Sequence, residues 1–161
     1  MFTIRFSIRP YLAEYCSLKY SWPHRSACKI PPSSELHVLF LELLSKRPVT
    51  AGRETGNIEF ILPNRSSGKR TVTYNYLSQR SQRRIEQYLY VMFWAEFHRF
   101  TEYQLHVKGE SLLMSVLLFK SKYNIESLSQ DAFIKNYQRW RDRQAFQRRV
   151  YRTQNRCQPF V

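Results

Sequence analysis

Arginine and lysine side chains form two runs in this chain, and the chemistry they offer is the binding of a polyanion. The first run lies between Phe60 and Ile85, where there is no acidic residue, and the second extends from Lys135 onward with Asp142 as its one acid. Together they supply most of the formal net charge of +14. Basic charge concentrated in this way is typical of a surface that binds nucleic acid. The candidate nucleic-acid-binding residues are Arg65, Lys69, Arg70, Arg80, Arg83, Arg84, Lys135, Arg139, Arg141, Arg143, Arg148, Arg149 and Arg152.

The second run follows an aromatic pattern that predicts a helix from Ser129 to Arg148. Arg139 and Arg143 are four residues apart, which makes them neighbours on a helix surface, and Arg141 and Arg148 are seven apart on a similar face. The aromatic residues at core-facing spacing are Phe133, Tyr137 and Trp140. Such a helix is suited to lie in a major groove or along phosphates. The alternative is a solvated cationic helix end, which the helix dipole favours in any case.

The first run contains two features that suit phosphate. Arg65 to Arg70 combines three cations with two serines and a glycine, and we expect this segment to be a hairpin tip that contacts a nucleic-acid backbone as a wing does. The alternative is an ordinary polar turn, because serine, glycine and asparagine are common in any hairpin loop. Arg80, Arg83 and Arg84 begin the next predicted helix, where the helix dipole disfavours cations. Their placement suggests an outside anionic partner.

Two other chemistries have weaker support in the sequence. A zinc site is conceivable from Cys16, His24, Cys28 and His37, but the spacing lacks the close chelating pair of a zinc finger. A hydrolytic metal site is conceivable from His98 and His106 with Glu96, Glu102 and Glu110, although a polar helix face explains these residues equally well. No phosphate-binding loop, nucleophile elbow or HExxH motif is present. We therefore expect no cofactor and no enzymatic activity, with a metal-dependent nuclease as the alternative.

The elements that must position these residues follow from hydrophobic periodicity and helix caps. Alternating apolar residues predict strands over 2–8, 58–62 and 72–76, and segment 63–70 is expected to join the last two strands as a hairpin. Periodicity predicts helices over 11–20, from the cap Ser34 to the stop at Arg47 and Pro48, and over 78–103, 112–123 and 129–148. The fold class is therefore α+β, mostly helical with a small antiparallel sheet, in a partial winged-helix order and with a C-terminal pair resembling a helix-turn-helix.

Composition favours one folded unit. We expect a single nucleic-acid-binding domain over 1–150 and a basic tail over 151–161, because no linker-like segment divides the chain. Three cysteines without a CxxC pair favour a reducing compartment, so a cytoplasmic, nucleoid-associated protein is expected. The longest apolar runs fall short of the roughly 20 residues of a membrane span, and no membrane partner is expected.

The pattern as a whole predicts a non-enzymatic DNA-binding protein, such as a regulator or an accessory factor of replication or transposition. Duplex DNA is favoured as the partner, and RNA or a single strand is a variant of the same prediction. The alternative is a structural or adaptor subunit that docks through its basic faces onto a nucleoprotein or protein complex. A protein partner or a second copy of the chain is compatible with either hypothesis.

Overall fold

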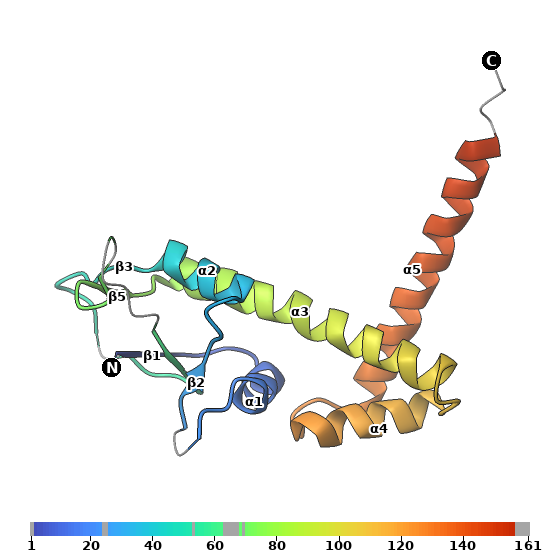
Figure 1. Ribbon diagram of the computed structural model, residues 1–161, viewed down its shortest axis with the longest axis horizontal. Coiled ribbons are helices and arrows are strands. Elements are labelled where there is room, and N and C mark those ends of the chain that lie inside the picture. The colour runs from blue at the N-terminus through green and yellow to red at the C-terminus, as the bar shows by residue number, and fades with distance from the viewer. Residues whose placement is uncertain (1, 24–25, 53, 63–67, 69, 157–161) are drawn as a thin grey trace.

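The structure, a computed structural model, describes residues 2–23, 26–52, 54–62, 68 and 70–156, with side chains described up to Tyr151 (Figure 1). Helices dominate, and the predicted α+β class is confirmed. The elements are β1 (Thr3–Phe6), α1 (Pro10–Lys19), β2 (Cys28–Lys29), α2 (Glu35–Leu43), β3 (Ser45–Lys46), β4 (Ile58–Ile61), β5 (Tyr74–Tyr76), α3 (Gln79–His106), α4 (Leu112–Tyr123) and α5 (Gln130–Arg156).

The strands form two small sheets, and their pairing differs from the prediction. One sheet has the order β1-β4-β2 and the other pairs β3 with β5. Because β4 is antiparallel to β1 but parallel to β2, the larger sheet is mixed, and the predicted purely antiparallel sheet is wrong. The predicted hairpin between 58–62 and 72–76 is also wrong, since β1 and β2 occupy both edges of β4. Strand β5 therefore pairs antiparallel with β3 instead.

The core of the N-terminal half, which holds the strands and helices α1 and α2, is aromatic and closely packed. The rings of Phe6 and Phe60 stack with centroids 5.8 Å apart, and Phe40 of α2 packs 5.2 Å from Phe60. Helix α2 ends at Leu43, earlier than predicted, because Leu44 adopts an extended conformation that leads directly into β3. Before β4 the chain passes so close to β1 that a Cβ atom on Gly56 would lie 2.0 Å from the carbonyl carbon of Phe6.

Helix α3 is the element that both halves share. In Figure 1 it runs along the length of the molecule, with α2 beside its first turns and α4 beneath its last turns. Its buried residues change face along its length, from Ile85 and Leu89 to Phe97, His98 and Thr101. This change lets one helix pack on the N-terminal half with its first turns and on α4 and α5 with its last turns.

Helices α4 and α5 are separated by a capped turn. Asn124 ends α4 in the left-handed conformation, with φ of 46°, which asparagine tolerates better than most residues. The Ser129 hydroxyl accepts a hydrogen bond from the Ala132 amide at the start of α5. The predicted limits of α4 and the predicted serine cap of α5 are confirmed. Helix α5 continues past Arg148 to Arg156 without a break at the expected boundary between domain and tail.

Candidate nucleic-acid interface

The first part of α5 is anchored by aromatic packing against α3 and α4. Phe133 lies 4.8 Å from Phe97 of α3 and 6.1 Å from Phe119 of α4, measured between ring centroids. Phe133 and Tyr137 are buried, and Trp140 is half-buried against the core. From position 141 to 151 only Gln144 is shielded from solvent to a similar degree. In Figure 1 this second part of α5 projects away from the body of the molecule.

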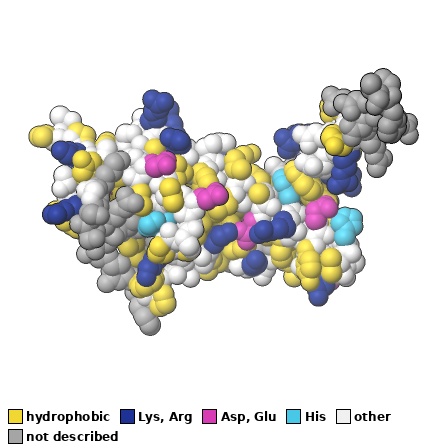
Figure 2. All heavy atoms as spheres, turned by 45° about the horizontal axis from the view of Figure 1, so that its top comes forward, with side chains coloured by type: hydrophobic (Ala, Val, Ile, Leu, Met, Phe, Trp, Pro, Cys, Tyr) yellow, Lys and Arg dark blue, Asp and Glu magenta, His cyan; other side chains and the backbone are white. Residues whose placement is uncertain are grey.

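The basic side chains of α5 are exposed as far as the structure describes them. Every candidate on this helix whose side chain is described is exposed: Lys135, Arg139, Arg141, Arg143, Arg148 and Arg149. Within the described part of the chain, no ion pair joins Arg139, Arg141, Arg143 or Arg148 to a carboxylate. Lys and Arg side chains are visible along the projecting end of the molecule in Figure 2. Their positive charge is therefore available to a partner.

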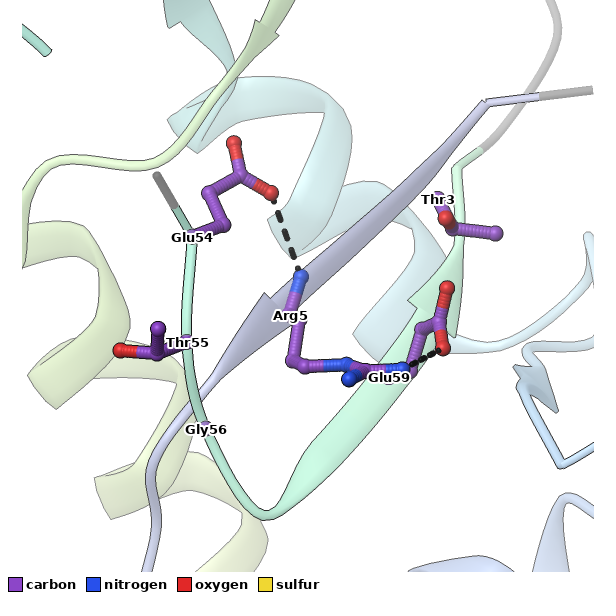
Figure 3. Close-up of a pocket in the computed structure, with 6 residues that line it drawn as sticks. All are labelled: Thr3, Arg5, Glu54, Thr55, Gly56 and Glu59. Atoms are coloured by element: carbon purple, nitrogen blue, oxygen red, sulfur yellow. Dashed lines mark hydrogen bonds and ion pairs between the residues drawn. The ribbon is translucent and has the colours of Figure 1, made fainter. Parts of the chain in front are cut away.

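Three arginines of the N-terminal half form ion pairs within the fold. Arg5 illustrates this in Figure 3: its backbone N–H donates to Glu54 at 3.3 Å, and its guanidinium pairs with Glu59 at 2.7 Å. A hydrogen bond from the Thr3 side chain, together with the Arg5 guanidinium, holds the pKa of Glu59 low. Similar ion pairs join Arg9 to Glu86 and Arg47 to Glu54. Arg5, Arg9 and Arg47 therefore offer less free charge to a partner than the arginines of α5 that have no ion pair among the described residues.

The cations of α5 face two directions. On a helix of 3.6 residues per turn, Lys135 and Arg139 lie on the side opposite the buried Phe133 and Tyr137. Arg141 and Arg148 instead line a groove between α5 and the last turns of α3, consistent with the predicted similar face for this pair. The helix therefore presents an outward basic face and a separate pair of arginines at a groove.

The arginines at the start of α3 lie far along that helix from α5. Arg80, Arg83 and Arg84 are exposed, and in the described part of the chain none of them pairs with a carboxylate. His98 contacts α5 and follows Arg80 by eighteen residues, which is five helical turns. The two residues therefore lie on the same face of α3, about 27 Å apart along its axis. Arg80 thus projects from the same side of α3 on which α5 packs, and Arg83 and Arg84 lie beside it.

The remaining candidates are placed only in part. Arg65 and Lys69 of the predicted tip lie outside the described residues. Arg70 is exposed, and its carbonyl accepts hydrogen bonds from the Thr73 and Tyr74 amides. Arg152 belongs to α5, but its side chain lies outside the described part. Because β4 and β5 belong to different sheets, no hairpin of these two strands carries the tip as a wing.

The turn before α5 is held by a carboxylate from a distant part of the chain. Glu14 of α1 accepts hydrogen bonds from the amides of Glu126 and Ser127 and from the Ser127 hydroxyl at 2.9 Å. These bonds fix the angle at which α5 leaves α4. The sequence carries no signal for this role, because Glu14 lies more than a hundred residues before the turn.

Phe146 is a second residue that sequence reasoning did not identify. Its side chain is 67% exposed, and on the helix it lies beside the face that carries Arg139 and Arg143. The signal in the sequence was a phenylalanine within a basic stretch, with Val150 as its one apolar neighbour at helical spacing. An apolar ring among cations is suited to contact a thymine methyl group.

The residues proposed for metal chemistry serve other purposes. His98 is only 7% exposed, and its Nε2 atom lies 2.7 Å from Oδ1 of Asn136. Burial lowers the pKa of His98 and favours the neutral ring. Among the described residues, no group of three or more His, Cys, Asp or Glu side chains lies close enough to hold a metal ion. His24, one of the zinc candidates, lies outside the described residues.

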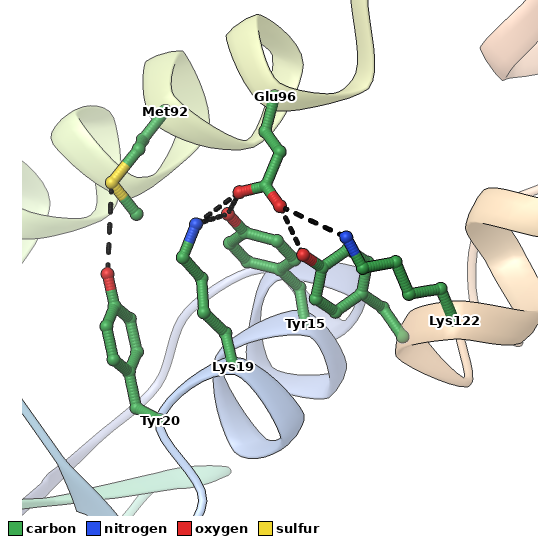
Figure 4. Close-up of polar contacts among 7 residues, drawn as sticks. Tyr15, Lys19, Tyr20, Met92, Glu96 and Lys122 are labelled. Atoms are coloured by element: carbon green, nitrogen blue, oxygen red, sulfur yellow. Dashed lines mark hydrogen bonds and ion pairs between the residues drawn. The ribbon is translucent and has the colours of Figure 1, made fainter. Parts of the chain in front are cut away.

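Glu96 is the centre of a network of hydrogen bonds between helices (Figure 4). Tyr15 donates to its carboxylate at 2.5 Å, and Lys19 and Tyr123 also bond to it. Burial alone would raise the pKa of Glu96, but these hydrogen bonds outweigh burial and lower the pKa. The network joins α1, α3 and α4, so Glu96 faces away from His98 and the two do not form a site together.

Cys16 and Cys28 are buried in the core. The Cys28 thiol donates to the Cys16 carbonyl at 3.5 Å, and burial raises the pKa of Cys28 to about 11. Burial also raises the pKa of Cys16, so both thiols are protonated at neutral pH.

Comparison with protein families, with curated proteins and with solved structures finds no match to this chain. In the described residues, no helix is long and apolar enough to cross a membrane.

Proposed function

We propose that this chain is a non-enzymatic protein that binds duplex DNA, as a regulator or as an accessory factor of replication or transposition. The observation that supports this proposal is the exposure of Arg139, Arg141, Arg143 and Arg148, none of which pairs with a carboxylate within the described part of the chain. They belong to a helix that follows α4 and a short capped turn. Ion pairs within the fold neutralise Arg5, Arg9 and Arg47, whereas Arg139 and Arg143 have none among the described residues.

The outward face of α5 is the surface we assign to the duplex. A major groove about 12 Å wide admits one α-helix, and Lys135, Arg139 and Arg143 would then approach base edges or phosphates. Asp142 lies on the same side of the helix. A carboxylate there repels phosphate but accepts a hydrogen bond from the N4 amino group of cytosine. This arrangement favours a helix inside the groove over one that lies along a backbone.

The proposal is tested by fluorescence anisotropy with duplex DNA, single-stranded DNA and duplex RNA at several salt concentrations. The test variant is Arg139→Gln with Arg143→Gln. The matched control is Lys29→Gln with Lys46→Gln, which removes the same charge from exposed positions in the N-terminal half. We expect tightest binding to duplex DNA. Loss of two phosphate contacts should reduce the slope of log K against log salt by about 1.8, while the control slope stays unchanged.

Two outcomes would contradict the proposal. Equal weakening by the test and control pairs would show that net charge matters and the α5 face does not. Weak binding to all three nucleic acids, unchanged by either pair, would redirect the search to a protein partner with an acidic surface. Preference for RNA or for a single strand would retain the α5 surface but replace duplex DNA as the ligand.

A further inference from the structure

A groove of about 460 Å³ lies between the last turns of α3 and the middle of α5. Its floor and rims include Leu105 and His106 from α3 and Trp140, Arg141, Gln144 and Arg148 from α5. The volume is within the range of small-ligand pockets. The groove lies on the side of α5 opposite the outward face assigned to the duplex, so a second part of a ligand would reach it by passing around the helix.

An aromatic stack ends at this groove. The rings of Trp94 and His98 lie nearly parallel, at 6.2 Å and 26°. His98 in turn stacks on Trp140, with centroids 4.6 Å apart and an interplanar angle of 18°. Trp94 and His98 are buried, but Trp140 is half-buried and lines the groove. The indole is therefore held by His98 on one face, and the Tyr137 ring packs 5.7 Å from it at 35°. The part of the indole that remains exposed lines the groove.

The charges around the groove favour a ligand that also carries phosphate. Arg141 and Arg148 stand at its rim, and within the described part of the chain neither pairs with a carboxylate. The acid of the groove, Glu102, already accepts the Tyr137 hydroxyl and lies 3.4 Å from Nε2 of His106. Its charge is thus partly engaged. An aromatic platform flanked by two arginines is the combination by which proteins hold unpaired nucleotides.

We propose that this groove binds one unpaired nucleotide of the nucleic-acid ligand, with the base stacked on Trp140 and the adjoining phosphates at Arg141 and Arg148. The inference rests on the proposed function and deepens it. The outward face of α5 would hold the duplex, and a single-stranded end that passes around the helix would place a base in the groove. The expected substrate is therefore a junction between duplex and single strand.

The test compares three DNA ligands by anisotropy: a blunt duplex, the same duplex with a short 3′ overhang of thymidines, and the same duplex with an abasic overhang of equal length. The abasic overhang keeps the phosphates and removes the bases. We expect the thymidine overhang to bind about tenfold more tightly than the abasic one, the effect of one stacked base. Overhangs of the opposite polarity are measured in parallel, so that the preferred end is identified.

The same ratio is then measured for Trp140→Leu and for Trp22→Leu. Trp22 is also half-buried but lies under Lys29, in the N-terminal half. Trp140→Leu should abolish the preference for bases and Trp22→Leu should retain it, provided that circular dichroism shows both variants to be folded. If Trp140→Leu does not fold, Arg141→Gln with Arg148→Gln replaces it, since these exposed side chains do not anchor the helix. Because both overhangs keep their phosphates, this pair should weaken both of them relative to the blunt duplex, and unchanged binding of both would contradict the inference.

Equal affinity of the wild-type protein for the thymidine and abasic overhangs, at either polarity, would overturn the inference without any variant. That result is distinguishable from failure of the proposed function. A duplex-binding protein without a base site would bind all three ligands equally and tightly. A protein with the base site alone would bind the blunt duplex weakly and still prefer the overhang that carries bases.

Discussion

His98 shows how a single residue links the packing of α5 to pH. Its ring is buried between Trp94 and Trp140, and its Nε2–H donates a hydrogen bond to Oδ1 of Asn136. Burial lowers the pKa of His98, and the nearby Arg143 acts in the same direction. The folded state therefore binds a proton at this ring less readily than the unfolded state does.

The stability contribution of neutral His98 should be lost at mildly acidic pH. It is fully present above the unfolded pKa, near 6.5, and declines as pH falls from there toward the lower folded pKa. We expect the free energy of unfolding of the wild type to fall between about pH 7.5 and about pH 5.5 by more than that of His98→Gln. Urea unfolding of both proteins measures this difference. An identical decline in the two would show that another group is responsible.

At the scale of the elements, the turn between α4 and α5 depends on Glu14. Removal of its carboxylate should destabilise the fold by about 2 kcal/mol, because hydrogen bonds to a charged acceptor are among the stronger ones. Glu14→Ala should also weaken DNA binding, since the direction of α5 would no longer be fixed. Glu126→Ala is the matched control. It also removes one glutamate charge at this turn, but Glu126 bonds to Glu14 through its backbone amide, which the substitution keeps. Denaturant unfolding and anisotropy provide the two measurements, and equal effects would exclude the specific role of Glu14.

The sequence predicted the elements better than it predicted their partners. Helix α4 was located correctly because apolar periodicity and a following asparagine are local signals. The pairing of β4 with β1 and β2 was not predictable in this way, since alternation identifies a strand but not the edge it joins. Strands β2 and β3 are too short to produce a period at all.

For the candidate site, too, the positions on one helix were predictable and the contacts between helices were not. Exposure of Arg139 and Arg143 follows from helix spacing, and the structure places these side chains as expected. The groove at Trp140 was not predictable, because it requires two turns of α3 to lie beside α5. Spacing alone placed Trp140 in the core, where it is in fact half-buried.

At the scale of the whole molecule, two basic regions lie on one side of α3 and are separated along it. The distance of about 27 Å from Arg80 to His98 corresponds to about 8 base pairs of duplex. We propose that a duplex held by α5 reaches the start of α3 only if it extends about 8 base pairs beyond α5 along α3. The contribution of Arg80, Arg83 and Arg84 should then depend on duplex length.

The variant Arg80→Gln with Arg83→Gln and Arg84→Gln tests this dependence. We expect no loss of affinity on a duplex that covers α5 alone. On a duplex longer by about 8 base pairs or more, the loss should be at least tenfold at low salt, with a smaller salt slope. Anisotropy over a series of duplex lengths measures the transition. A loss that is the same at every length would mean that the two regions act without a common duplex.

The projecting part of α5 has a thermodynamic consequence of its own. Its turns after Trp140 have little packing to support them, so they depend on backbone hydrogen bonds that are exposed to water. Such segments open locally at a free-energy cost far below that of global unfolding. A ligand that binds only the helical form shifts this opening equilibrium by mass action. Part of the intrinsic affinity is then spent on ordering the helix, and amide hydrogen exchange in these turns would record the occupancy of the site.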